Sequence, residues 1–267
     1  EIFDAGEYKE YIEKLGVQDE LRRCISEGFE GFELYFQPIY NPENDCLAGS
    51  EALIRWNSRK YGFMGPDRFI PLLEDSALII PLGKWIIDNA ARTCNKWITN
   101  IPNFVMHINL SFIQIVKSNI IKDVIENIGR YSASNNHYIF EVTETIEMDQ
   151  MPAVDRVFKE FIKNGFRLAI DDFGTGYSNY GYMRDRTFDI VKVDRSFVTD
   201  IDKLKDNYLM VSFIIKMAHE MGLHVCIEGV ETKEELSCVK ELGADYIQGY
   251  YYGKPVCVAD FEEQHLK

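Results

Sequence analysis

The chain has 267 residues, 46% of them hydrophobic, and a formal net charge of −14 at pH 7. This length and composition suit one large globular domain or two small ones. The negative charge argues against a surface for a DNA or RNA polymer or an anionic membrane, because both are bound by clustered lysine and arginine. Six cysteines without metal-ligand spacing are typical of reduced thiols, so we expect a cytoplasmic location.

No run of about 18 apolar residues and no signal-like start is visible in the sequence. We therefore expect no membrane contact by this segment. The chain begins at Glu1 rather than at a methionine. We expect it to be fused to further signalling domains in a longer, even membrane-anchored, protein.

In chain order, residues 1–28 are rich in charge with apolar side chains at helical spacing, which predicts a helical lead-in. Residues 29–267 are expected to form one domain, because no linker or low-complexity tract interrupts them. Two strand-like runs flank the turn-forming segment NPENDC and predict an antiparallel hairpin. Strands and helices then alternate. The expected strands are 33–39, 47–56, 104–109, 138–144, 167–171, 190–194, 224–228 and 246–248; the expected helices include 67–73, 81–99, one reaching 128, 152–164, 178–184, 207–221 and 233–242.

This alternation is typical of a parallel sheet, and eight strands over roughly 240 residues predict an α/β fold of the TIM-like (β/α)8 barrel type. We expect one antiparallel strand, which we assign to the second strand of the opening hairpin. A doubly wound open sheet is the alternative. The ends of the strands favour the barrel, because their polar groups would converge on one face, where such enzymes keep their active sites. These groups are Gln37, Asn109, Glu141, Asp171 with Asp172, Lys192, Glu228 and Gln248, joined by Glu51 from the second strand.

Carboxylate and amide oxygens without histidine or cysteine select hard cations, here Mg²⁺ or Mn²⁺. The candidate metal ligands are Glu51, Asn109, Glu141, Asp171, Asp172 and Glu228. Two ions would share one carboxylate, for which the adjacent pair of aspartates is suited. A single acidic residue at a strand end is more often a helix cap or a surface group, but the whole set is hard to explain that way. The five scattered histidines are assigned no chemistry.

Lys192 is unusual within an apolar strand. An ion pair with core carboxylates would explain it, and such a pair is compatible with orienting a water or binding a phosphate oxygen. Arg55 could bind a phosphate through two hydrogen bonds, with a surface salt bridge as the ordinary alternative. Glu144 is expected to anchor the glycine loop after Asp172 rather than to touch the substrate.

Several of these runs together resemble the signature of EAL domains, phosphodiesterases that hydrolyse cyclic di-GMP. The resemblance covers about residues 20–260 in the right order. It rests on Gln37-Pro38-Ile39, Glu51-Ala52-Leu53-Ile54-Arg55-Trp56, Asn109-Leu110-Ser111, Glu141-Val142-Thr143-Glu144, Asp171-Asp172-Phe173-Gly174-Thr175-Gly176, Lys192-Val193-Asp194, Glu228-Gly229-Val230-Glu231 and Gln248-Gly249-Tyr250.

The resemblance implies a TIM-like barrel with one reversed strand, two Mg²⁺ or Mn²⁺ ions, and opening of cyclic di-GMP to linear 5′-pGpG in bacterial signalling. It implies that one metal is held by Glu51, Asn109, Glu141 and Asp171, and the second by Asp171, Asp172 and Glu228. By the same resemblance, Lys192 orients the attacking water and Gln37, Arg55 and Gln248 contact or position the substrate. A homodimer formed through helices near the loop after Asp172 is also implied.

One departure from the family pattern lies at Asn179, Tyr180 and Gly181, where a serine and a leucine usually follow Ser178. By the resemblance, this segment supports the dimer contact and the metal loop. Two alternatives remain open. One is a catalytically silent receptor for cyclic di-GMP, and the other is an unrelated metal-dependent barrel enzyme that acts on another phosphate ester.

Overall fold

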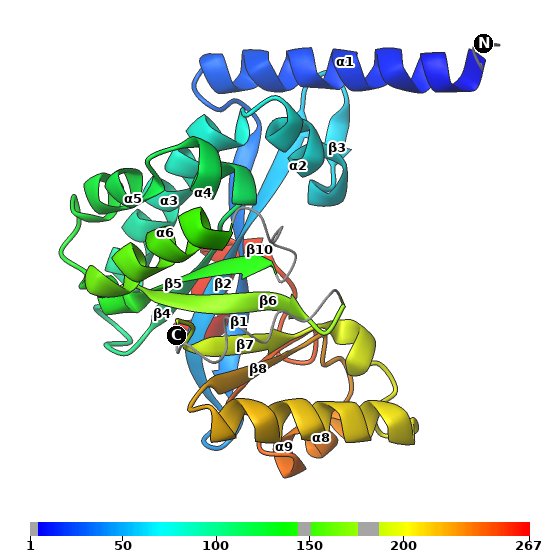
Figure 1. Ribbon diagram of the computed structural model, residues 1–267, viewed down its shortest axis with the longest axis vertical. Coiled ribbons are helices and arrows are strands. Elements are labelled where there is room, and N and C mark those ends of the chain that lie inside the picture. Colours follow the sequence, from blue (N-terminus) through cyan, green and yellow to red (C-terminus); the bar gives the residue numbers. More distant parts are fainter. Residues whose placement is uncertain (1–4, 144–150, 176–186) are drawn as a thin grey trace.

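Eight strands form a closed barrel in the computed structural model, which describes residues 5–143, 151–175 and 187–267 (Figure 1). Their order around the barrel is β1, β2, β4, β5, β6, β7, β8 and β9, and β9 pairs with β1 to close it. The closed ring confirms the predicted barrel and excludes an open sheet. The strands are β1 (Phe32–Asn41), β2 (Cys46–Ser58), β4 (Val105–Asn109), β5 (Tyr138–Thr143), β6 (Arg167–Phe173), β7 (Ile190–Val193), β8 (His224–Glu228) and β9 (Tyr246–Gln248).

The reversed strand is β1, which runs antiparallel to both β2 and β9. All other neighbours in the barrel, β2 included, are parallel. Our assignment of the reversed direction to the strand of Glu51 was therefore wrong. A hairpin pattern shows that two strands oppose each other but not which one agrees with the rest of the sheet. As a result Gln37 does not end its strand but lies within it, opposite Glu51.

Two short strands extend the sheet beyond the barrel. β3 (Gly62–Met64) pairs with the end of β2, and β10 (Val256–Cys257) pairs with β1. Neither was predicted, because three and two residues are too few to show an alternating pattern.

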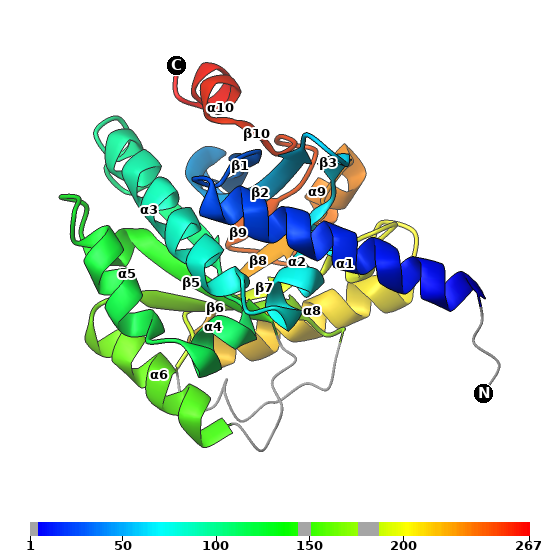
Figure 2. The ribbon, with the colours of Figure 1, turned by 90° about the horizontal axis from the view of Figure 1, so that it is seen from above.

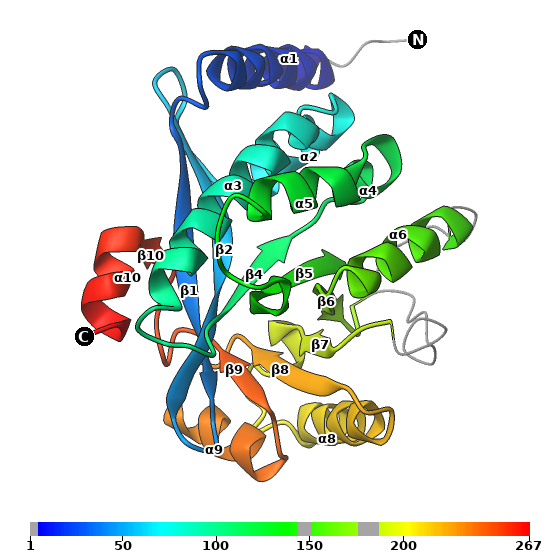
Figure 3. The same ribbon diagram turned by 90° about the vertical axis from the view of Figure 1, so that its left-hand side faces the viewer.

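Helices surround the barrel, with α3 to α6 on one side and α8 and α9 on the other (Figures 1 and 3). The last helix, α10, packs beside β1 (Figure 3). None of the helices in the described ranges is both long and apolar enough to cross a membrane. The helices are α1 (Ala5–Ser26), α2 (Pro66–Asp75), α3 (Ile79–Trp97), α4 (Phe112–Lys117), α5 (Ile120–Ile128), α6 (Met151–Lys163), α8 (Lys205–Glu220), α9 (Lys233–Glu241) and α10 (Val258–His265), with short 3-10 turns at Asn135–His137 and Arg195–Phe197.

The helix expected up to residue 128 is two helices. Ser118 has extended backbone angles and ends α4, and the side chain of Asn119 then accepts a hydrogen bond from Lys122 N to begin α5. These polar residues bond locally to the backbone, which is why they favour helix ends. The short helix predicted over 178–184 lies outside the described residues.

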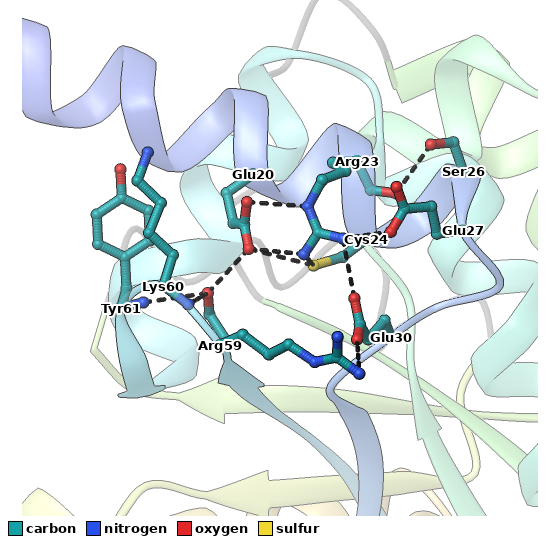
Figure 4. A network of polar contacts seen from close by, with 10 residues as sticks. Glu20, Arg23, Cys24, Ser26, Glu27, Glu30, Arg59, Lys60 and Tyr61 are labelled. Atoms are coloured by element: carbon teal, nitrogen blue, oxygen red, sulfur yellow. Dashed lines mark hydrogen bonds and ion pairs between the residues drawn. The ribbon is translucent and has the colours of Figure 1, made fainter.

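The amino-terminal segment is one helix, α1, whose first half extends beyond the barrel (Figures 1 and 2). Its second half buries Val17, Leu21 and Cys24. A polar network fixes this half to the barrel (Figure 4). Arg23 on α1 donates to Glu20 at 2.8 Å and to Glu30 at 2.9 Å, and Arg59, in the turn after β2, pairs with Glu30 at 2.6 Å.

Inside the barrel, side chains lie in layers because every second residue of a strand faces inward. Five buried residues, Ile39, Ile139, Ala169, Ile190 and Cys226, form a small apolar cluster separate from the main core. Each stands two residues along its strand from one of the predicted site residues. The apolar cluster is therefore the layer directly below the candidate site.

Candidate active site

Lys192, on β7, lies at the centre of the polar layer and is completely buried. Its Nζ is 2.7 Å from Glu228 Oε1, 2.8 Å from Glu141 Oε2, 3.1 Å from Asp171 Oδ1 and 3.3 Å from Glu51 Oε2. The prediction that this lysine pairs with core carboxylates is confirmed. Burial disfavours the charged amine, but four carboxylates outweigh burial and raise the pKa of Lys192 well above its usual value.

Glu51, on β2, is held by three side chains from distant parts of the chain. Asn109 donates to its Oε1 at 2.5 Å, and Gln248 donates to its Oε2 at 2.6 Å, the oxygen that also faces Lys192. Burial alone would raise the pKa of Glu51, but Lys192 and the two amide donors outweigh it and lower the pKa to about 2. Glu51 is thus an ionised carboxylate in a fixed orientation.

Gln37 and Gln248 connect the first and last strands of the barrel beside Glu51. Gln248 Nε2 is 3.1 Å from Gln37 Oε1, and Gln37 donates to Gly253 O at 3.3 Å. Both glutamines are buried. Their hydrogen bonds orient Glu51, while contact of either one with a substrate stays a prediction.

His107, on β4, is a site residue that the sequence did not single out. Its Nδ1 is 2.6 Å from Glu141 Oε1, and both side chains are buried. Burial lowers the pKa of His107 to about 3, so the ring is neutral and Nδ1–H donates to the carboxylate. Its position in the sequence could have indicated this role. His107 precedes Asn109 by two residues, and residues two apart face the same side of a strand.

Asp171, Asp172 and Glu228 form the acidic side of the layer, next to Lys192. Each offers one carboxylate oxygen, and these three oxygens lie within 4.8 Å of one another. Asp171 Oδ1 is buried without a well-aligned hydrogen bond, although Lys192 is near. Three carboxylate oxygens this close together fit a hard divalent cation.

The pKa values in this group have a common cause. Burial, followed by repulsion among the carboxylates, raises the pKa of Glu141, Asp171 and Asp172, and burial raises that of Glu228 to about 8. Lys192 opposes each of these shifts. One lysine does not balance so many carboxylates, and a divalent cation would complete the balance.

The chain turns sharply just after the two aspartates. Asp172 has a φ of 54°, an unusual backbone for a residue with a side chain, and Gly174 has a φ of 98°. A side chain at Gly174 would also approach the Phe197 ring to 2.7 Å. The pairing of β6 with β7 shifts register between Ile170 and Phe173. Such local strain is concentrated at functional sites, and here it places two carboxylates side by side.

A cleft of about 440 Å³ adjoins this layer on the side of β2 and β4. It is lined by Arg55 and Asn109 together with Ser111, Glu74 and Thr143 among others. Arg55 lies over the Tyr35 ring at 5.6 Å and forms no ion pair with any residue that the structure describes. The alternative prediction, a surface salt bridge of Arg55, is therefore wrong for the described residues. Arg55 instead lines a cleft beside the layer of buried carboxylates.

Of the predicted residues, Glu51, Asn109, Glu141, Asp171, Lys192, Glu228 and Gln248 are joined by direct contacts, Asp172 adjoins Asp171, Gln37 contacts Gln248, and Arg55 lines the neighbouring cleft. Glu144 lies outside the described residues, as do Asn179 to Gly181.

The fold and the acidic layer define an α/β-barrel protein with a site suited to hard metal ions. A comparison with protein families matches residues 18–255 to the EAL domain, so the chain belongs to this family. This match confirms the resemblance seen in the sequence.

Among curated proteins, the chain is 31% identical over 252 residues to PdeG of Escherichia coli K12, named a probable cyclic di-GMP phosphodiesterase; the match covers 94% of this chain and 49% of PdeG. Among solved structures it is similar to the EAL enzyme Bd1971 in its cAMP- and cyclic-di-GMP-bound form. The TM-score is 0.89 and the sequence identity 32%, and the match covers 97% of this chain and 70% of that chain. It is also similar to the MucR phosphodiesterase in complex with cyclic di-GMP. Here the TM-score is 0.84 and the sequence identity 30%, and the match covers 90% of this chain and 99% of that chain.

The chain spans between 31% and 49% of the length of the first curated relatives that it matches.

Proposed function

We propose that the protein is a metal-dependent phosphodiesterase that hydrolyses cyclic di-GMP to linear 5′-pGpG. The observation that carries this proposal is the buried polar layer, in which Lys192 contacts four carboxylates beside a cleft lined by Arg55. Membership of the EAL family supports it, as do the solved relatives whose titles name bound cyclic di-GMP.

The proposed metal ligands are Glu51, Asn109, Glu141, Asp171, Asp172 and Glu228, with Asp171 shared between two ions. Oxygen ligands favour Mg²⁺ or Mn²⁺. When bound, these ions would neutralise charge on the phosphodiester and make a water nucleophilic at neutral pH.

The chain's own residues would position the reactants. Lys192 Nζ lies between Glu141 and Glu228. Its N–H groups face carboxylates, and cations bound to those carboxylates would leave one N–H group to donate a hydrogen bond to a water or to a phosphate oxygen. Arg55 would bind a non-bridging phosphate oxygen from the cleft. Attack of water on phosphorus breaks the bond to one 3′ oxygen, which takes up a proton, and leaves a 5′-phosphate and a free 3′-hydroxyl.

The fixed orientation of Glu51 has a role in this scheme. Gln248 and Asn109 each hold one of its oxygens, so little reorganisation is needed when a cation binds. Outer hydrogen bonds of this kind commonly tune metal affinity and activity by about 10–100-fold. We therefore assign Gln248 and Gln37 a positioning role in addition to the predicted substrate contact.

The direct test is incubation of the purified chain with cyclic di-GMP and either Mg²⁺ or Mn²⁺, with 5′-pGpG followed by chromatography. We expect conversion that stops when EDTA is added. Asp171→Asn should reduce the rate by more than about a hundredfold, since it removes the shared ligand. Asp19→Asn, a change at an exposed carboxylate on α1, is the matched control and should leave the rate unchanged.

Absence of product with both ions would contradict the proposal. Binding of cyclic di-GMP in EDTA, without hydrolysis after metal is added, would instead support the receptor alternative. Circular dichroism of each variant separates a lost ligand from a lost fold.

Three wider expectations belong to the same proposal. Residues 1–28 would serve as a lead-in to a domain over 29–267. The chain would form a homodimer near the loop after Asp172. It would also belong to a longer signalling protein, for which the partial coverage of its relatives offers support.

A further inference from the structure

A second cavity, of about 410 Å³, lies at the amino-terminal end of the barrel, opposite the acidic layer. It is lined by the first residues of several parallel strands, such as Val105 of β4, Arg167 of β6 and Tyr246 of β9, and by the end of the reversed strand β1. Small-molecule sites are commonly about 300–1,000 Å³ in volume. The cavity is therefore large enough for a ligand with a single ring.

The walls combine an apolar surface with one positive charge. Ile39, Leu47, Val105 and Ile190 contribute aliphatic side chains. Of the described residues that line the cavity, Arg167 is the only arginine or lysine, and none is an aspartate or glutamate. In a chain with a net charge of −14, a cavity lined by an arginine and no acid has an unusual local potential. The wall chemistry favours a ligand that is negative at one end and apolar at the other.

Arg167 itself supports this reading. On β6 it alternates with Ala169 and Asp171, which both face the barrel interior, so its side chain enters the barrel from below. Its Nε is buried without a hydrogen-bond partner. Among residues 5–143, 151–175 and 187–267 no ion pair or hydrogen bond of its guanidinium is found. A buried donor without a partner is costly, and a ligand oxygen would satisfy it.

The carboxylates next to the lining strands are already engaged. Asp189 Oδ2 accepts a hydrogen bond from Leu168 N at 3.1 Å. Asp245 Oδ2 is 2.8 Å from His219 Nε2, and its Oδ1 is 3.3 Å from His224 Nδ1. Neither acid pairs with Arg167. A purely structural arginine at this position would be expected to have such a partner.

We propose that this cavity binds a small organic anion, with its carboxylate or phosphate on Arg167 and its apolar body against Ile39, Val105 and Ile190. A guanidinium matches both anionic groups through parallel hydrogen bonds. The amide side chain of Asn103, exposed at the cavity, and the Tyr246 ring add contacts for a planar body. An organic cation does not fit, because none of the described lining residues is a carboxylate.

The site is separate from the proposed catalytic chemistry. His107 contributes to both regions, since it lines the cavity and donates to Glu141 in the acidic layer. The roof of the cavity belongs to the apolar layer, of which Ile39 and Ile190 line it, and the acidic layer lies on the far side of that layer. Binding can nevertheless be measured without any turnover, so failure of this proposal and failure of the phosphodiesterase proposal are distinguishable.

The test uses benzoate as the probe and benzamide, its uncharged analogue, as the reference, with isothermal titration calorimetry on the full chain. We expect benzoate to bind at one site with a Kd on the order of 1 mM and benzamide at least about tenfold more weakly. Arg167→Met should weaken benzoate binding at least about tenfold, because it removes the charge and keeps an apolar side chain. Arg22→Met, at an exposed arginine on α1, should change nothing.

A second variant guards against misfolding of the first. Asn103 is exposed and lines the cavity, so Asn103→Trp should block the cavity without disturbing the core. Loss of benzoate binding in both variants supports the site. Equal binding of benzoate and benzamide, unchanged binding in either variant, or no binding of benzoate up to about 10 mM would overturn it.

Discussion

The two ends of one barrel carry opposite chemistry on the same strands. Glu141, Asp171 and Lys192 face inward at the carboxyl end, and Ile139, Ala169 and Ile190 face inward two residues earlier on those strands. In the first set, Lys192 forms ion pairs with Glu141 at 2.8 Å and with Asp171 at 3.1 Å. The second set belongs to a buried apolar layer, and Arg167 lies below it without an ion pair to any described residue.

The difference shows how a buried charged site is maintained. Taking carboxylates out of water costs free energy. Their attraction to Lys192 offsets that cost only when the distances and angles of the contacts are favourable. The apolar layer fixes the strands from below, so the polar side chains above it project from a rigid base. His107 lies beside Ile139 on the neighbouring strand and connects this level to the upper layer through its contact with Glu141.

The largest expected effect comes from Lys192→Met at the carboxyl end. The change leaves Glu51, Glu141, Asp171 and Glu228 without their shared cation. Removing one partner of a buried pair costs about 3–5 kcal/mol, and loss of a positioned proton donor costs about 10²–10⁴ in rate. Urea unfolding and the hydrolysis assay measure the two effects.

Lys216→Met, at an exposed lysine on α8, is the matched control and should be neutral in both assays. Because the loss is one of charge balance, added Mn²⁺ should restore part of the stability of Lys192→Met. Stability equal to that of the unmodified chain in EDTA would show that the lysine is not the cation that holds this layer.

The next effect is expected at the boundary between the two layers. His107→Leu removes the donor to Glu141 Oε1 and replaces the ring with an apolar side chain of similar size. We expect a rate or Mn²⁺ affinity lower by about 10–100-fold, as for other outer hydrogen bonds to metal ligands. His107→Asn retains an N–H group and should recover part of the loss. If the Leu and Asn variants are equally impaired, the role of His107 is packing alone. The matched control is Ile139→Leu, a conservative change in the neighbouring apolar layer. His219→Leu is unsuitable as a control because it would remove the contact of His219 with Asp245.

The smallest effect is expected at the amino-terminal end, where Asp245 contacts His219 and His224. Burial opposes ionisation of Asp245, but the two histidines and Val225 N outweigh burial and lower its pKa to about 2. The hydrogen bond to Asp245 raises the pKa of His224. Because its pKa is lowered, Asp245 stabilises the fold above about pH 4, and this contribution fades toward pH 2. Because its pKa is raised, His224 stabilises the fold below about pH 6.5, and this contribution is lost at higher pH.

Asp245→Asn should therefore destabilise the fold by about 1 kcal/mol near pH 5, and by less at pH 8 and at pH 2. Urea unfolding at the three pH values measures this. Glu263→Gln, at an exposed pair with Lys267, serves as the reference. A difference that does not vary with pH would show that the histidine contacts contribute no charge interaction.

Much of this molecule follows from local patterns in the sequence. All eight barrel strands were predicted because their interiors are apolar and each is bounded by turn-forming or helical segments. The site residues were found because a polar group at the end of an apolar strand stands out. Asp171 and Asp172, followed by glycines, gave the clearest signal of this kind.

What was missed depends on contacts between distant residues. The direction of β1 is decided by its pairing with β9, more than 200 residues away in sequence, as the Gln37 to Gln248 contact illustrates. His107 gains its role only because Glu141 lies beside it on the next strand. The cavity around Arg167 exists only where several strand starts meet, and no single segment signals it.

The pairing between β1 and β9 also has a consequence for folding. Ile39 pairs with Gln248, so the last seam of the barrel joins the beginning of the domain to its end. Closing a loop between such distant residues costs the chain more entropy than closing a short one. The same seam carries the Gln37 to Gln248 hydrogen bond that orients Glu51. A chain whose barrel is open at this seam therefore lacks the hydrogen bonds that orient Glu51.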